Sequence, residues 1–261
     1  MFYKWTEGHE PLLAVAVHNG HELRQEVDQI IALEDESRLR EEDPYTGMLT
    51  TVAQNQLVVY RSRFEVDLNR PREKAIYISS EDAWDLKVWK EPISDEIITR
   101  SLKEYDRFYA RLHKICSRLE KTFGRFAVLD LHSYNHRRQG PEVPPEDQEQ
   151  NPDVNIGTGT LNRDQWTNLV DRFTLDLRAF NYLGRSLDVR ENVKFKGGHL
   201  VRYIHDSFPN SGCALAVEFK KFFMDEWTGK VDDRQLRTLR EALLSTLPGI
   251  VEELSRTGSK D

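Results

Sequence analysis

Three short apolar segments constrain the fold more than any other feature of the sequence. They read LLAVAV at 12–17, FAVLDL at 126–131 and ALAVEF at 214–219. Runs of this length and composition are typical of strands that are buried on both faces of a sheet. The first two are followed directly by a histidine and the third contains a glutamate. In a parallel sheet, polar residues at such strand ends face the crevice where ligands bind.

Patterns of helical periodicity separate these apolar segments. We predict amphipathic helices over 22–33, 94–121, 164–183 and 232–255. We also predict two further strands, over 56–60 and 63–69. Strands that alternate with long helices predict an α/β fold, in which a mostly parallel, mixed sheet is covered by helices on both faces. We expect a single domain over residues 1–261.

Two segments without periodicity are predicted to be loops. The densely charged residues 38–44 end at a proline, which favours a loop after the first helix. Residues 139–153 are rich in Pro, Glu, Gln and Asp, and we predict a mobile surface loop there.

The composition argues against several kinds of partner and compartment. The 261 residues include 37 Lys and Arg against 44 Asp and Glu, a formal net charge of −7. This charge gives no general attraction to nucleic acid or to an anionic membrane, so we expect neither as a partner. The sequence has 2 cysteines, no signal-peptide pattern and no apolar stretch of about 18 residues. These features predict a soluble, cytoplasmic protein.

Two histidines, His18 and His132, follow predicted buried strands. Imidazole and carboxylate groups are ligands that zinc accepts while it keeps a fourth position open for water. For any single histidine a hydrogen-bonded or solvated role is the more common alternative, but the position at a strand end favours a ligand. Asp130 lies two residues before His132 and shares its face of the strand, so it can support the metal site from behind; the alternative is a turn cap.

The residues themselves leave the carboxylate ligand open. The acidic run Glu41, Glu42 and Asp43 offers three candidates, although such a run is equally typical of a solvated surface. Glu22, four residues after His18, is a rival.

A buried glutamate and several arginines complete the set of candidate functional residues. Glu218 lies inside ALAVEF, and a buried charge is costly unless it has a partner or a task. The structural alternative is a salt bridge with Lys220, Lys221 or an arginine. Arginines flank the predicted strand 63–69, and their guanidinium groups are suited to gripping carboxylates.

Seven short motifs follow one another in a recognisable order. They are VHNG at 17–20, EEDPYTGML at 41–49, SRFEVDLNR at 62–70, LDLHS at 129–133, NIGT at 155–158, GGH at 197–199 and ALAVEFKKFFMDE at 214–226. From near residue 12 to near residue 226 the chain resembles the N-formylglutamate amidohydrolase family, which is related to the zinc carboxypeptidases and to the aspartoacylase and succinylglutamate desuccinylase group. The resemblance implies a zinc-carboxypeptidase-like fold and zinc-dependent hydrolysis of the amide bond of an N-acyl, N-formyl-type acidic amino acid.

The resemblance also implies roles for individual residues. His18 and His132 match the first and last zinc (Zn2+) ligands, and within the acidic cluster Glu42 is the expected third ligand. Glu218 matches the catalytic glutamate, which takes a proton from water and passes it to the leaving amine.

Three further residues match substrate-binding positions. Asn69 and Arg70 correspond to the pair that holds the substrate carboxylate, and Arg63 to an additional substrate-facing arginine. The first motif departs from the family, because valine and asparagine flank His18 where proline and serine or alanine are usual. Other readings are a carboxypeptidase- or desuccinylase-like hydrolase of a longer substrate and a noncatalytic relative that binds an acidic metabolite.

Overall fold

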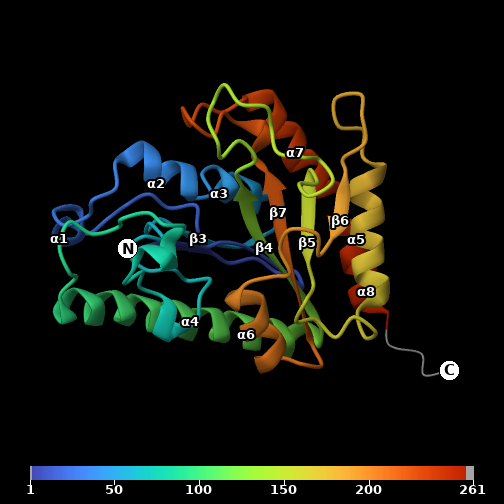
Figure 1. Ribbon diagram of the computed structural model, residues 1–261. Helices are drawn as coiled ribbons and strands as arrows, with labels where there is room; N and C mark the ends of the chain where they lie inside the picture. The colour runs from blue at the N-terminus through green and yellow to red at the C-terminus, as the bar shows by residue number, and fades with distance from the viewer. Residues whose placement is uncertain (1, 257–261) are drawn as a thin grey trace.

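A seven-stranded sheet forms the centre of the protein, whose computed structural model describes residues 2–256 (Figure 1). Its strands are β1 (Tyr3–Thr6), β2 (Leu12–Ala16), β3 (Asn55–Val59), β4 (Phe126–Tyr134), β5 (Val154–Gly157), β6 (Val189–Glu191) and β7 (Gly212–Lys220). They lie in the order β1-β3-β2-β4-β7-β5-β6. The neighbours β3, β2, β4 and β7 are parallel, whereas β1 and β5 are antiparallel to β3 and β7. The predicted mostly parallel, mixed sheet of a single α/β domain is confirmed.

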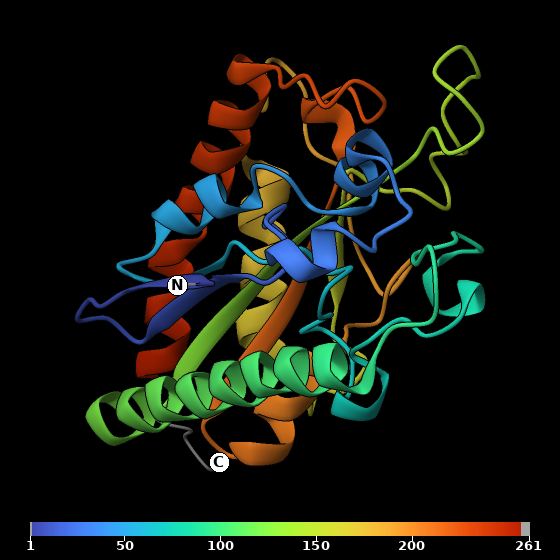
Figure 2. The ribbon, with the colours of Figure 1, turned by 90° about the vertical axis from the view of Figure 1, so that its left-hand side faces the viewer.

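Helices cover both faces of the sheet, as predicted. The long ones are α4 (Asp95–Phe123), α5 (Thr167–Ala179), α6 (His199–Ser207), α7 (Asp233–Ser245) and α8 (Leu247–Ser255). Successive residues of a strand face opposite sides, so Val128 packs with the residues of α4 and α6, and Leu129 with those of α5, α7 and α8. Figure 2 shows α4 running across the strands.

Shorter helices lie in the segments that connect these elements. They are α1 (Gln25–Asp28), α2 (Asp35–Glu41) and α3 (Thr46–Leu49), with 3-10 helices over Thr50–Val52, Arg72–Lys74, Ser80–Ala83 and Lys221–Phe223. Among residues 2–256, no helix combines the length and the apolar character needed to cross a membrane.

Tertiary pairing overrides the local pattern in the first third of the chain. The predicted helix over 22–33 is wrong beyond the four residues of α1, because isolated bridges at both ends join Glu22 to Arg61 and Ile31 to Trp89. The predicted strand over 63–69 is also wrong. That segment forms turns, in which the Glu65 N–H donates to the Ser62 carbonyl. The predicted loop over 38–44 is wrong in its first part, because residues 38–41 belong to α2.

Elsewhere the predicted elements form, with changed bounds. The helix predicted over 232–255 is two helices, because the chain bends at Thr246 and Pro248 begins α8. The short elements β1, β5, β6 and α6 were not predicted from the pattern. Residues 135–153 contain no helix or strand, and the mobility of 139–153 stays a prediction.

The buried histidine of α6 is held in its neutral form. His205 Nδ1 lies 2.8 Å from the Thr160 hydroxyl, and Nε2 lies 3.1 Å from the Ala214 carbonyl oxygen on β7. Burial lowers the pKa of His205 to about 4.

Acid should therefore destabilise the fold through His205. The unfolded chain takes up this proton near pH 6.5 and the folded chain only near pH 4, so the stabilising contribution is complete above pH 6.5 and is lost as the pH falls towards 4. Between about pH 7 and pH 5, urea denaturation should show the free energy of unfolding falling by about 2 kcal/mol more in the wild type than in His205→Gln. Equal falls in the two proteins would contradict this assignment.

Candidate functional site

The sheet brings the predicted site residues to one edge. In the strand register, His132 on β4 lies beside Glu218 on β7, which in turn lies beside Asn155 on β5. His18 follows β2 by two residues, and its ring centroid is 4.9 Å from that of His132. Because neighbouring parallel strands end at the same edge, residues far apart in the sequence converge there.

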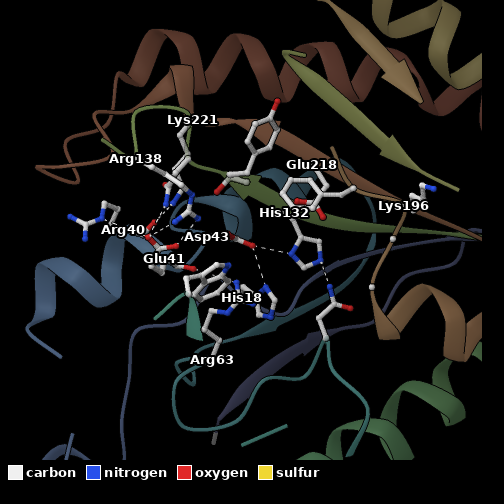
Figure 3. Close-up of a pocket in the computed structure, with 18 residues that line it drawn as sticks. His18, Arg40, Glu41, Asp43, Arg63, His132, Arg138, Lys196, Glu218 and Lys221 are labelled. Carbon is white, nitrogen blue, oxygen red and sulfur yellow. Dashed lines mark hydrogen bonds and ion pairs between the residues drawn. The ribbon is translucent and has the colours of Figure 1, made fainter. Parts of the chain in front are cut away.

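A buried carboxylate lies between the two histidines. Asp43 Oδ2 is 2.9 Å from His132 Nδ1 and 3.4 Å from His18 Nδ1 (Figure 3). One donor atom from each of these residues lies within 4.8 Å of the others. Burial alone would raise the pKa of Asp43, but hydrogen bonds from His132 and His18 outweigh it and lower the pKa. Asp43 is therefore an anion poised beside two nitrogen donors.

Backbone contacts explain why Asp43 lies there. The Asp43 N–H donates to the His18 carbonyl over 2.9 Å, and the Gly47 N–H donates to Asn19 Oδ1 over 2.8 Å. From the other side, Lys221 Nζ donates to the carbonyl oxygens of Arg40 and Glu42, over 2.6 and 2.8 Å. The segment after α2 is thus held between the end of β2 and the end of β7.

The geometry replaces Glu42 with Asp43 as the third candidate ligand. Glu42 has extended backbone, so its side chain and that of Asp43 point to opposite sides. The Glu42 carboxylate instead lies 2.5 Å from His21 Nδ1 and accepts a hydrogen bond from Ser62. Of the other candidates, Glu41 pairs with Arg138, and Glu22 is exposed.

A carboxylate lies behind each of the two histidine rings. His18 Nε2 lies 2.7 Å from Asp67 Oδ1, and His132 Nε2 lies 3.0 Å from Asp130 Oδ1. Each ring therefore directs its Nδ1 towards Asp43. Within the described residues, the Asp130 oxygens are fully buried and have no hydrogen bond of good geometry. Asp130 thus takes the supporting position predicted for it.

The donor set fits a zinc ion. Two imidazole nitrogens and one carboxylate oxygen are ligands of catalytic zinc sites, and each lies about 2.0–2.2 Å from the metal, so donors of a tetrahedral shell are roughly 3.3 Å apart. The distances of 2.9 and 3.4 Å between Asp43 and the two rings are close to that separation. A carboxylate behind each ring is also a regular feature of metal-binding histidines.

Glu218 is a buried carboxylate without a salt bridge. In the part of the chain that the structure describes, no basic group other than those at the histidine cluster approaches it closely enough for an ion pair, because Lys220 pairs with Asp153 and Lys221 binds backbone carbonyls. Burial raises the pKa of Glu218 to about 7, although His132 lowers it. The salt bridge considered from the sequence is therefore not formed.

The two histidines, Asp43 and Glu218 line a cavity of about 220 Å³. Its lining residues are His18, Arg40, Glu41, Asp43, Arg63, Asn69, Trp84, His132, Ser133, Tyr134, Asn135, Arg138, Phe195, Lys196, Gly197, Gly198, Glu218 and Lys221. Figure 3 shows Arg40, Glu41, Arg138 and Lys221 gathered on one side of Asp43, with Glu218 and Lys196 on the other.

Arg63 and Asn69 reach this cavity. Arg63 donates to Asp67 over 2.8 Å and to the Tyr77 hydroxyl over 3.0 Å. The Asn69 side chain lies 3.2 Å from His132 Nε2 and accepts a hydrogen bond from the Leu200 N–H. Because a Cβ on Gly198 would lie 2.3 Å from the Asn69 amide, this close approach requires glycine.

Two of the predicted site residues, Glu42 and Arg70, do not line the cavity. Arg70 is held elsewhere. Its Nη2 donates to the Asp82 carbonyl over 2.6 Å, and its guanidinium carbon lies 4.5 Å from the centre of the Tyr77 ring. Sequence reasoning had also missed Arg138, Lys221 and the aromatic Trp84. Nothing in their local sequence distinguishes them from surface residues. The buried Asp67 was missed for a similar reason, because in SRFEVDLN it stands on the polar face of the alternation, opposite Phe64 and Val66.

The buried pair of Asp67 and Arg63 should matter for stability. Replacing Asp67 with asparagine removes the negative charge beside a buried guanidinium, so Asp67→Asn should lower the free energy of unfolding by about 3–5 kcal/mol, measured by urea denaturation. Asp106→Asn is the matched control, because Asp106 and Arg72 form an ion pair of 2.7 Å that is exposed. Its effect should be far smaller. Similar losses in both variants would contradict the importance of burial.

Comparisons with known proteins show the family and the fold. The model of the N-formylglutamate amidohydrolase family matches residues 10–223. A comparison with curated protein sequences gives no match. The crystal structure of N-formylglutamate amidohydrolase from Ralstonia eutropha JMP134 is similar with a TM-score of 0.73 and 20% identity, over 96% of this chain and 98% of that chain.

Two other solved structures are similar at lower scores. A gene product of Agrobacterium tumefaciens has a TM-score of 0.63 and 18% identity, over 93% of this chain and 92% of that one. A metallo-carboxypeptidase from Burkholderia cenocepacia has a TM-score of 0.39 and 14% identity, over 95% and 58%. The family match spans most of the sequence, so this chain belongs to the N-formylglutamate amidohydrolase family.

Proposed function

We propose that the protein is a zinc-dependent amidohydrolase that removes an N-formyl-type acyl group from a small acidic amino acid. The observation that carries the proposal is the buried group of His18, Asp43 and His132, which opens onto a cavity that Glu218 also lines. Family membership supports hydrolysis of an amide, and the chemistry of the donor set supports zinc.

His18, Asp43 and His132 would hold the metal. When bound, zinc supplies a Lewis acid that polarises the substrate carbonyl and makes water more acidic. Asp67 and Asp130 keep the two rings in place by contacting the ring nitrogens that face away from Asp43.

Glu218 is proposed as the general base. A base works best when its pKa lies near the working pH, and burial raises the pKa of Glu218 to about 7. Its position beside His132 on the neighbouring strand supports this role. Glu218 would take a proton from the attacking water and pass it to the nitrogen of the leaving amine.

Arg63 is proposed to hold the α-carboxylate of the substrate. It lines the cavity, and its guanidinium is fixed by Asp67, by Tyr77 and by the Glu41 carbonyl. With five N–H donors in total, it keeps two for a ligand. Asn69 would act mainly by positioning His132, because its side chain is already engaged there and at Leu200.

Metal content tests the ligand set directly. His18→Ala, Asp43→Ala and His132→Ala should each lose the roughly one zinc per chain expected of the wild type, measured by elemental analysis of the purified proteins. Glu42→Gln should keep it, because the Glu42 carboxylate faces His21 and Ser62. Loss of zinc in Glu42→Gln with retention in Asp43→Ala would reverse the assignment.

Replacing the base should separate catalysis from metal binding. Glu218→Gln should lower kcat for N-formyl-L-glutamate by about 10²–10⁴-fold while zinc stays bound, because general-base catalysis contributes a factor of this size. Glu65→Gln is the matched control: Glu65 is also buried, burial raises its pKa to about 7, and it does not line the cavity. A Glu218→Gln enzyme with a near-normal kcat would show that another group is the base.

A further inference from the structure

The cavity has a cationic end that the metal chemistry does not use. Arg40, Arg138 and Lys221 meet there around one carboxylate, that of Glu41 (Figure 3). Arg138 Nη1 and Nη2 donate to Glu41 over 3.1 and 2.8 Å, and Arg40 Nε lies 3.7 Å from Glu41. Three cations stand against the carboxylate of Glu41, and they still outnumber the anions when the neighbouring Asp43 of the histidine cluster is included.

Arg138 is presented in a fixed orientation. Its two terminal nitrogens both bind Glu41, which is buried and also accepts a hydrogen bond of 3.2 Å from the Asn135 side chain. An arginine has five N–H donors, so three remain for a ligand. The Arg138 side chain is about 39% exposed, and it lines the cavity.

The backbone just before Arg138 is held in place by two residues that follow β7. The Glu226 carboxylate accepts hydrogen bonds from the N–H groups of His136 and Arg137, over 2.8 and 2.7 Å, and the Trp227 indole N–H donates to the Arg137 carbonyl over 3.0 Å. Although residues 135–153 have no regular structure, their first turn is therefore held at the cavity.

Arg70 cannot take this role from where it lies. It donates to the Asp82 carbonyl, stacks on Tyr77 and does not line the cavity.

We infer that Arg138, oriented by Glu41, is the residue that recognises the side-chain carboxylate of the substrate. This inference rests on the proposed function, with Arg63 holding the α-carboxylate nearer the metal group. Glu41 stays in place as the structural partner of Arg138, and the remaining positive charge of Arg40 and Lys221 favours an anionic ligand. The site would thus select an acidic amino acid over its uncharged analogue.

The test compares two substrates of nearly equal shape, N-formyl-L-glutamate and N-formyl-L-glutamine. For each zinc-loaded protein, the ratio of kcat/KM for the two substrates measures selection of the carboxylate. Arg138→Gln should lower this ratio by about tenfold or more, mainly by raising KM for N-formyl-L-glutamate, with kcat and zinc content little changed. Arg137→Gln is the matched control, because this neighbour does not line the cavity, and it should keep the wild-type ratio.

The outcomes separate this inference from the function on which it rests. If the wild type hydrolyses both substrates and Arg138→Gln keeps the wild-type ratio, or if Arg70→Gln lowers it instead, the inference is overturned while the amidohydrolase function stands. If the zinc-loaded wild type hydrolyses neither substrate, the proposed function fails and the inference falls with it.

Discussion

The arrangement of this site depends on the cost of burying charge. Asp67 is inaccessible to solvent, and an isolated carboxylate there would be strongly destabilising. It is stabilised because Arg63, Tyr77 and the Asn69 N–H donate to it, and it contacts His18. The same contacts orient His18 and bring Arg63 to the cavity. One requirement of physical chemistry, that a buried carboxylate be fully paired, therefore organises both His18 and Arg63.

The central strands and the long helices could be predicted from the sequence, because their apolar patterns are long and bounded. The same patterns located His18, His132 and Glu218, which the parallel sheet brings to one edge. The segments 22–33 and 63–69 could not be predicted, since distant partners contribute to both. Bridges join Glu22 to Arg61 and Ile31 to Trp89, and in the second segment the Asp67 N–H donates to the Ala75 carbonyl. Local periodicity carries no information about such distant partners.

The choice between Glu42 and Asp43 also could not be made from local sequence. Both belong to one acidic run, and composition gives them equal weight as ligands. Their roles are separated only by a backbone hydrogen bond from Asp43 to His18 and by the contacts of Lys221 with the neighbouring carbonyls. A one-residue shift in extended backbone reverses the direction of a side chain. Three-dimensional placement was therefore needed to distinguish them.

The contact between Lys221 and the segment after α2 also bears on when the site can form. Its partners, the carbonyls of Arg40 and Glu42, lie about 180 positions earlier in the chain. Contacts of such long sequence separation are slow to form, because the ends of a long loop must first meet. On the ribosome, the histidines and Asp43 emerge well before β7, which brings both Glu218 and Lys221. A nascent chain thus carries the proposed metal donors before it has the proposed base or the anchor that holds Asp43 in place.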